Sequence, residues 1–226
     1  MSETFEISHA ALVLVDVQEG FRGPSWGRSA NFSEALANIA ALGQAWEARG
    51  LPVVKVRHDS AHPLSTLRAG SLGNRFMAEV LELREDLLVT KTVNSSFLGT
   101  PDLARWLRSR RLGTIVVAGI QTNLCVETTA RMGGNLGFEV LIPLDATTTF
   151  DLEGPALTGG PPLRLTAEEL MTATAVNLHG DGFARVTDTA DILKHLAGKP
   201  VREVAPATPT AMVLPANANE TTGFGG

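Results

Sequence analysis

The sequence predicts an α/β fold in which helices cover both faces of a doubly wound parallel sheet. Six short β-rich runs alternate with helical patterns along the chain. Runs such as Ala10–Val15 are apolar at every position, which is typical of strands buried on both faces. Strands that alternate with helices form parallel sheets with right-handed crossovers. The predicted strands are residues 10–15, 51–56, 87–90, 114–118, 138–142 and 183–187.

Helix signals separate these predicted strands. Residues 33–49 repeat apolar side chains at helical spacing, and Gly50 follows as a stop. In Thr100-Pro101-Asp102 we expect a helix cap, a first-turn proline and a first-turn acid. Thr166 and Glu169 have the spacing of a capping box at the start of another helix.

Composition indicates one folded domain over residues 1–198. The 226 residues are 44% hydrophobic and 19% charged, which is typical of a packed globular protein. Residues 199–226 differ, because 16 of these 28 are Ala, Pro, Thr or Gly and no strand or helix period survives. We expect this tail to be mobile or to pack on a neighbouring subunit.

Charge and hydropathy exclude several classes of protein. The net charge of −5 argues against nucleic-acid binding, which requires a basic surface. The apolar runs are shorter than the roughly 20 residues of a membrane-spanning helix, and the start of the chain lacks a signal-peptide pattern. We therefore expect a cytoplasmic protein. The single cysteine, Cys125, excludes an internal disulfide and leaves a buried filler, a reactive thiol or an intermolecular partner.

Three chemically active residues follow predicted strands. In parallel sheets, ligands bind at the carboxyl ends of the strands. Asp16 follows the first strand, Lys91 the third and Cys125 the fourth. Each alone is more often structural, as a cap, a surface lysine or a buried thiol, but together they supply a proton acceptor, a cation and a nucleophile. With Thr122 or Asn123 as N-cap, Cys125 lies in a first helical turn that favours a thiolate.

Motifs around these residues carry a family resemblance. They are Asp16-Val-Gln18 with Phe21, Lys91 with Ser95-Ser-Phe97, and Gly119-Ile-Gln-Thr122 leading to Cys125-Val126. Together they resemble the isochorismatase-like cysteine hydrolases, which include nicotinamidases and N-carbamoylsarcosine amidases. Further segments, 57–60, 70–74 and 177–180, resemble the streptothricin-hydrolase-like branch. The resemblance covers about residues 10–193 and implies a six-stranded sheet of order 3-2-1-4-5-6.

The resemblance also implies a mechanism. Cys125 is the implied nucleophile, Asp16 the general base and acid, and Lys91 the cation that orients Asp16. A cis peptide bond is implied between Ile120 and Gln121, with the N–H groups of Gln121 and Cys125 forming an oxyanion hole. The implied reaction is cleavage of a C–N bond in a small amide, lactam or ureide through a thioester, without a cofactor, by a homodimer or homotetramer.

The resemblance places the substrate pocket under the loops that follow the first three strands. Some relatives bind a metal through an Asp-x-His pair and a later His, but here the order is His58-Asp59 with His62 later, so we expect no metal. We expect neutral His58 to form hydrogen bonds in the pocket. The predicted pocket residues are Phe21, Trp26, His58, Phe76, Phe97 and Leu98.

Other functions fit the sequence less well. An isochorismatase-type enol-ether hydrolase would use Asp16 without a nucleophilic cysteine, so Cys125 favours the amidase. A non-catalytic binding protein of the same fold would be expected to lack one member of the triad, and all three are present. A dinucleotide-dependent oxidoreductase is excluded because no Gly-x-Gly-x-x-Gly follows the first strand.

Overall fold

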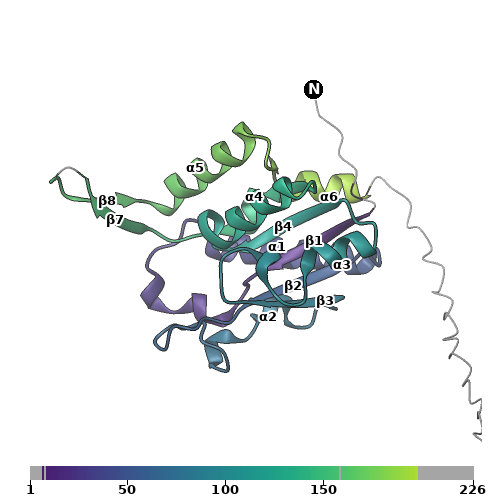
Figure 1. Ribbon diagram of the computed structural model, residues 1–226, viewed down its shortest axis with the longest axis horizontal. Coiled ribbons are helices and arrows are strands. Elements are labelled where there is room, and N and C mark those ends of the chain that lie inside the picture. Colours follow the sequence, from purple (N-terminus) through teal and green to yellow (C-terminus); the bar gives the residue numbers. More distant parts are fainter. Residues whose placement is uncertain (1–6, 8, 158, 198–226) are drawn as a thin grey trace, which may run out of the picture.

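A computed structural model describes residues 7, 9–157 and 159–197 and shows a parallel sheet between two layers of helices (Figure 1). The strand order β3-β2-β1-β4-β5-β9 confirms the predicted order, with β9 as the sixth predicted strand. A short strand that we did not predict, β6, pairs with the end of β4. The strands are β1 (Ala10–Val15), β2 (Val53–His58), β3 (Leu87–Lys91), β4 (Thr114–Ile120), β5 (Glu139–Pro143), β6 (Thr147–Thr148) and β9 (Arg185–Thr187).

Four strands, β2, β3, β4 and β5, end one or two residues further toward the carboxyl edge of the sheet than predicted. The ladder between β2 and β3 continues until His58 pairs with Lys91, and the ladder between β1 and β4 continues until Val15 pairs with Gly119. The polar residues at the end of β2 hid this extension, because partner strands rather than apolar side chains hold the backbone there. These longer ladders bring functional side chains to the same level at the sheet edge.

Helices cover both faces of the sheet because neighbouring side chains of a strand point to opposite sides. In β1, Leu12 and Leu14 pack with residues of α1, α2 and α6, whereas Val13 and Val15 pack with residues of α3, α4 and α5. The helices are α1 (Phe32–Ala48), α2 (Ala78–Leu81), α3 (Leu103–Ser109), α4 (Glu127–Asn135), α5 (Ala167–Gly180) and α6 (Thr189–Ala197). Single 3₁₀ turns cover Glu19–Arg22, Pro24–Trp26, Leu72–Asn74, Ser96–Leu98 and Leu144–Ala146.

The helix caps follow the sequence signals in one case and depart from them in another. The predicted capping box of α5 is present, with Thr166 and Glu169 bonded to each other's backbone N–H. At α3 the prediction was wrong, because the N-cap is Asp102, whose side chain accepts from the N–H of Arg105. Thr100 cannot cap the helix, since its N–H and carbonyl pair with Thr90 across a β-bridge.

Between β6 and α5 the chain forms a two-stranded antiparallel ribbon that we did not predict. Its strands are β7 (Leu152–Ala156) and β8 (Pro162–Leu165), and Figure 1 shows the ribbon extending away from the central sheet. Proline and glycine within this segment weaken the sequence signal for strands.

Two further expectations concern membrane-spanning helices and the predicted tail. Within the described part of the chain, no helix has both the length and the apolar character needed to cross a membrane. The predicted tail, residues 199–226, and its boundary at residue 198 lie outside the described residues, so both remain predictions.

The close contact between β1 and β4 depends on Gly119. This residue has a φ of +131°, and a Cβ atom there would lie 2.1 Å from the carbonyl oxygen of Val15. A strained φ alone costs about 1–3 kcal/mol, and here a backbone clash adds to it. The strand therefore has to move if any side chain is added.

We expect Gly119→Ala to lower the melting temperature by at least about 5 °C. Gly113→Ala is the matched control, because a Cβ atom at Gly113 would meet no atom within 4 Å and its φ is not positive. Thermal unfolding followed by circular dichroism measures both variants. Equal melting temperatures for the two would contradict the clash at Gly119.

Candidate active site

The carboxyl edge of the sheet brings the predicted triad together from three strands. Asp16 follows β1, Lys91 ends β3, and Cys125 lies in the turn that follows β4. Asp16 has a φ of +52°, a conformation that Asp adopts more readily than most residues. The backbone N–H of Asp16 still donates to the carbonyl of Val56, so the residue is held at the end of the sheet.

Asp16 and Lys91 form a buried ion pair. Nζ of Lys91 lies 2.6 Å from Oδ2 of Asp16, and the two side chains are 0% and 1% exposed. Oδ1, the other carboxylate oxygen, is buried and has no hydrogen-bond partner in the described part of the chain. Burial raises the pKa of Asp16, and the Lys91 ammonium opposes that rise. One oxygen is thus fixed by the cation, and the other is free to accept a proton.

The nucleophile candidate lies next to this carboxylate. A ligand atom from each of Asp16, His58 and Cys125 lies within 4.8 Å of the other two, and Sγ of Cys125 also approaches Oδ1 of Asn94 at 3.9 Å. Burial, followed by the charge of Asp16, raises the pKa of the Cys125 thiol to about 12. The resting thiol is therefore protonated at neutral pH. Our expectation of a favoured thiolate was wrong, because desolvation and Asp16 outweigh the effect of Lys91.

The backbone around Cys125 also differs from the prediction. Residues Thr122–Val126 form a π-helical turn that leads into α4, and the N–H of Val126 donates to the carbonyl of Gln121 five residues earlier. Thr122 and Asn123 lie inside this turn, so neither is its N-cap. Turns of this kind are rare and are frequent at functional sites.

The peptide bond between Ile120 and Gln121 is cis, and it joins β4 to this turn. The carbonyl of Gln121 accepts from the N–H groups of both Leu124 and Val126. The proposed use of the Gln121 and Cys125 N–H groups as oxyanion donors stays a prediction.

His58 completes the buried group from the end of β2. Its Nδ1 atom lies 3.3 Å from Nζ of Lys91. Burial lowers the pKa of His58, and the charge of Lys91 lowers it further, so the ring is neutral at neutral pH and Nδ1 can accept from the ammonium. Sequence reasoning missed Gln18, whose side-chain amide bonds both the N–H and the carbonyl of His58. The signal was its place in the Asp16-Val-Gln18 motif.

The remaining predicted pocket residues are placed differently. Phe21 and Trp26 pack against each other with ring centroids 4.7 Å apart, and both contact the ring of Phe150. Phe97 is buried and stacks on Phe138, Phe76 is partly buried against the core, and Leu98 is 63% exposed. Of the six predicted residues, His58 contacts Nζ of Lys91. The pocket roles of all six stay predictions.

The residues around the end of β2 that we considered as metal ligands do not come together as one group. Asp59 pairs with Arg57 at 2.8 Å, and His62 is exposed. In the part of the chain that the structure describes, the group close enough to share an ion is Asp16, His58 and Cys125. The Lys91 ammonium contacts two of these three side chains, so a bound cation would meet a positive charge there.

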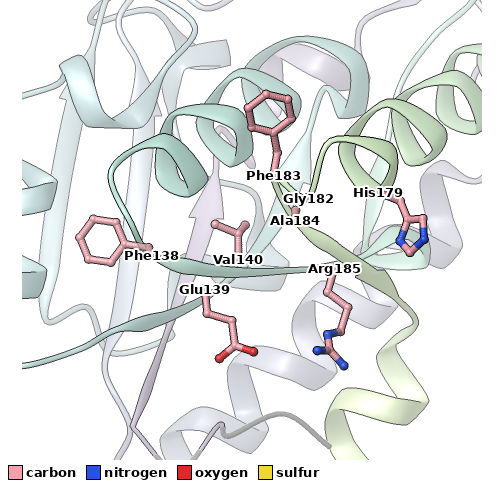
Figure 2. Close-up of a pocket in the computed structure, with 8 residues that line it drawn as sticks. All are labelled: Phe138, Glu139, Val140, His179, Gly182, Phe183, Ala184 and Arg185. Carbon is pink, nitrogen blue, oxygen red and sulfur yellow. The ribbon is translucent and has the colours of Figure 1, made fainter. Parts of the chain in front are cut away.

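A cavity of about 280 Å³ lies at the end of the sheet opposite the triad. Glu139 and Arg185 begin β5 and β9, so this cavity is at the amino ends of the strands, and Figure 2 shows both side chains pointing to the same side of the sheet. It is separate from the triad. Its lining residues are Phe138, Glu139, Val140, His179, Gly182, Phe183, Ala184 and Arg185.

Comparisons with known proteins agree with this fold. Residues 10–160 match the model of the isochorismatase domain. An uncharacterized isochorismatase family protein of Bacillus subtilis, YrdC, is 38% identical over 142 residues, which cover 63% of this chain and 75% of the relative. Nicotinamidase 3 of Arabidopsis thaliana is 28% identical over 205 residues, 84% of this chain and 89% of the relative.

The solved structures include a similar one. A putative hydrolase of the isochorismatase family from Chromobacterium violaceum superposes with a TM-score of 0.76 at 40% identity and covers 86% of this chain and 97% of its own. The chain belongs to the isochorismatase family. These matches support a hydrolase.

Alkylation of Cys125 tests the electrostatics of the site. Because the thiolate is the reactive form, iodoacetamide should label the native protein slowly at pH 7.5. Asp16→Asn removes the negative charge that raises the thiol pKa, so we expect labelling at least about ten times faster, which corresponds to one pKa unit. Mass spectrometry follows the labelling, and Cys125 is the single cysteine.

Asp59→Asn is the matched control, since Asp59 follows a neighbouring strand and pairs with Arg57. We expect this variant to be labelled at the native rate. If Asp16→Asn is labelled no faster than Asp59→Asn, Asp16 does not control the thiol.

Removal of Lys91 tests the buried ion pair. Burial raises the pKa of Asp16 in the folded protein, so protonation of Asp16 favours the folded state. This contribution to stability is complete at low pH and is lost as the pH rises. Lys91→Met removes the opposing charge, and we expect destabilisation by about 3–5 kcal/mol at pH 8 and clearly less at pH 4.5. Urea unfolding at the two pH values measures the difference.

Lys55→Met is the control for this experiment. Lys55 is 4% exposed, but its partner Glu85 is 41% exposed and remains hydrated when the lysine is removed. We expect the cost of Lys55→Met to be the same at both pH values. A pH-independent cost for Lys91→Met would contradict the coupling of Lys91 to Asp16.

Proposed function

We propose that this protein is a cysteine hydrolase that cleaves a C–N bond in a small amide, lactam or ureide through a thioester on Cys125. One observation carries the proposal: Lys91 fixes the Asp16 carboxylate through Oδ2, Oδ1 has no hydrogen-bond partner among the described residues, and a carboxylate oxygen of Asp16 lies within 4.8 Å of Sγ of Cys125. A carboxylate in this arrangement can move a proton between sulfur and a leaving nitrogen.

The first half of the reaction forms the thioester. Oδ1 of Asp16 takes the proton from Sγ of Cys125 as the sulfur attacks the substrate carbonyl carbon, and the carbonyl oxygen becomes an oxyanion. We assign the N–H groups of Gln121 and Cys125 to this oxyanion. Asp16 then gives its proton to the nitrogen, the C–N bond breaks, and the amine or ammonia leaves.

The second half returns the enzyme to its resting state. Asp16 takes a proton from water, and the water oxygen attacks the thioester carbon. The C–S bond breaks, the acid product leaves, and the thiolate regains its proton from Asp16. Each step moves a proton between groups of the site, so the charge of the enzyme does not change. An extra charge would be costly here, because the site is buried and Lys91 is the cation beside Asp16.

Proton transfer has to accompany the attack. With the thiol pKa at about 12, a free thiolate is scarce near neutral pH. The developing oxyanion removes negative charge from sulfur as it forms, so transfer and attack together cost less than transfer alone. Lys91 remains close to the negative charge throughout, and neutral His58 adds an acceptor for its ammonium.

The charge of the residues near the strand ends favours an uncharged substrate. Arg57 pairs with Asp59 and Arg28 with Asp151, so these cations are already neutralised. An enol-ether substrate such as isochorismate carries two carboxylates and would gain little from paired arginines. Together with Cys125 beside Asp16, this supports C–N hydrolysis over the enol-ether reaction. Assembly into a dimer or tetramer stays a prediction.

We expect a panel of neutral amides, lactams and ureides to contain substrates, detected by release of ammonia or amine or by ring opening. Cys125→Ala should lower kcat by about 10³-fold or more while the protein stays folded, because no other group can form the thioester. Ser109→Ala on α3 is the control and should keep native activity, since Ser109 is exposed on the helix surface.

Acid quenching during turnover should trap an acyl group on Cys125, which mass spectrometry identifies by its added mass. A Cys125→Ala variant with native kcat would overturn the covalent mechanism. Cleavage of an enol ether by that variant would favour the alternative reaction of the same fold.

A further inference from the structure

Three consecutive threonines, Thr147, Thr148 and Thr149, lie fully buried beside the end of β4. A buried hydroxyl without a partner costs free energy, so such a run persists only where each hydroxyl is bonded. Each of the three has a partner, and two of the three bond the turn that carries Cys125. No part of the hydrolysis scheme uses these residues.

Thr147 bonds the turn through Thr122. The hydroxyl of Thr122 donates to Oγ1 of Thr147 at 2.9 Å, and Thr147 donates onward to the carbonyl of Leu144 at 2.8 Å. Thr122 is also fully buried, so this chain of donors has no contact with solvent. The first residue of the π-helical turn is thus tied to the chain after β5.

Thr149 bonds the residues on either side of Thr122. Its hydroxyl lies 2.5 Å from Oδ1 of Asn123 and 3.3 Å from Oε1 of Gln121, and its single hydrogen is shared between these two amide oxygens. Two threonines therefore contact three consecutive residues, Gln121, Thr122 and Asn123, just before Cys125.

The segment that carries Thr147 is itself held firmly. Oδ1 of Asp145 accepts from both the N–H and the hydroxyl of Thr189 at 2.8 Å, and the side chain of Asn38 donates to the carbonyl and to Oδ2 of Asp145. These bonds connect it to α6 and α1. Threonines placed on this segment can therefore hold the turn instead of moving with it.

The turn belongs to a rare class of helix, so contacts from outside it can decide its position. Bonds from residue i to i−5, such as that from Val126 to Gln121, make a rare and less stable helix. On its other side, α4 is held by Thr129, whose hydroxyl accepts from the N–H of Ser96 at 3.0 Å.

We propose that Thr147 and Thr149 are positioning residues that hold Gln121 and the Thr122–Val126 turn and thereby fix Sγ of Cys125 against Asp16. The proposal rests on the proposed function only in taking Cys125 as the nucleophile. Displacement of a reacting group by 1 Å lowers a rate by about 10²-fold. Loss of either hydroxyl should therefore lower kcat more than it raises KM.

The test compares Thr147→Val, Thr149→Val and Thr147→Ser with the native protein. We expect the two valine variants to lower kcat by roughly 10- to 100-fold with KM within about twofold, and Thr147→Ser to keep native values. We also expect iodoacetamide to label Cys125 several times faster in the valine variants, because a displaced thiol is less buried and farther from Asp16. A purely structural role would lower the melting temperature without changing either rate in the folded protein.

Thr148→Val is the matched control, because Thr148 is equally buried but its hydroxyl bonds Ser29 at 2.7 Å and not the turn. It should lose stability and keep native kcat and labelling rate. If Thr147→Val does not fold, Thr122→Val removes the same contact from the side of the turn.

Native labelling rates in folded Thr147→Val (or Thr122→Val) and Thr149→Val would overturn the proposal, as would equal effects in Thr148→Val. A protein that hydrolyses none of the panel would count against the proposed function alone, since labelling of Cys125 requires no substrate.

Discussion

The buried ion pair between Asp16 and Lys91 is the interaction on which the site depends. The two residues are 75 positions apart in the sequence and come from β1 and β3, which are separated by β2. Neighbouring strands lie about 4.8 Å apart, so a side chain must extend across a whole strand to join them. The long, flexible side chain of lysine can do this, and it passes Nδ1 of His58 at the end of β2. The strand order thus sets the distance between the two positions, and lysine is long enough to span it.

This pair also determines where protons reside. Removal of two charges from water is costly, and the cost is offset only if each charge stays beside the other. Lys91 satisfies one oxygen of Asp16, and the other oxygen stays buried without a partner. Such an atom is unfavourable in a structural site, but it suits a carboxylate that must accept a proton. Burial, together with this negative charge, raises the pKa of Cys125 and keeps the thiol protonated.

The sequence allowed much of this arrangement to be predicted, for a physical reason. Strands that are buried on both faces have a strong apolar signal, and the residues that end them lie at one edge of a parallel sheet. Asp16, Lys91 and Cys125 could be identified from position and residue type alone. The resemblance added the sheet order and the cis bond before Gln121. The chemical roles of these residues remain proposals that rest on their geometry.

The features that were not predicted depend on contacts between residues that are distant in the sequence. Thr147 and Thr149 bond side chains at the π-helical turn, and no local pattern around Cys125 reveals those partners. The pKa of the thiol depends on burial by several elements, whereas sequence reasoning counted only the helix terminus and Lys91. A short-range pattern can therefore locate the candidate nucleophile, but tertiary contacts set its protonation and its direction. In this fold the acid, the cation and the turn are each held by a different part of the sheet edge, and the proposed reaction requires all three to be aligned at once.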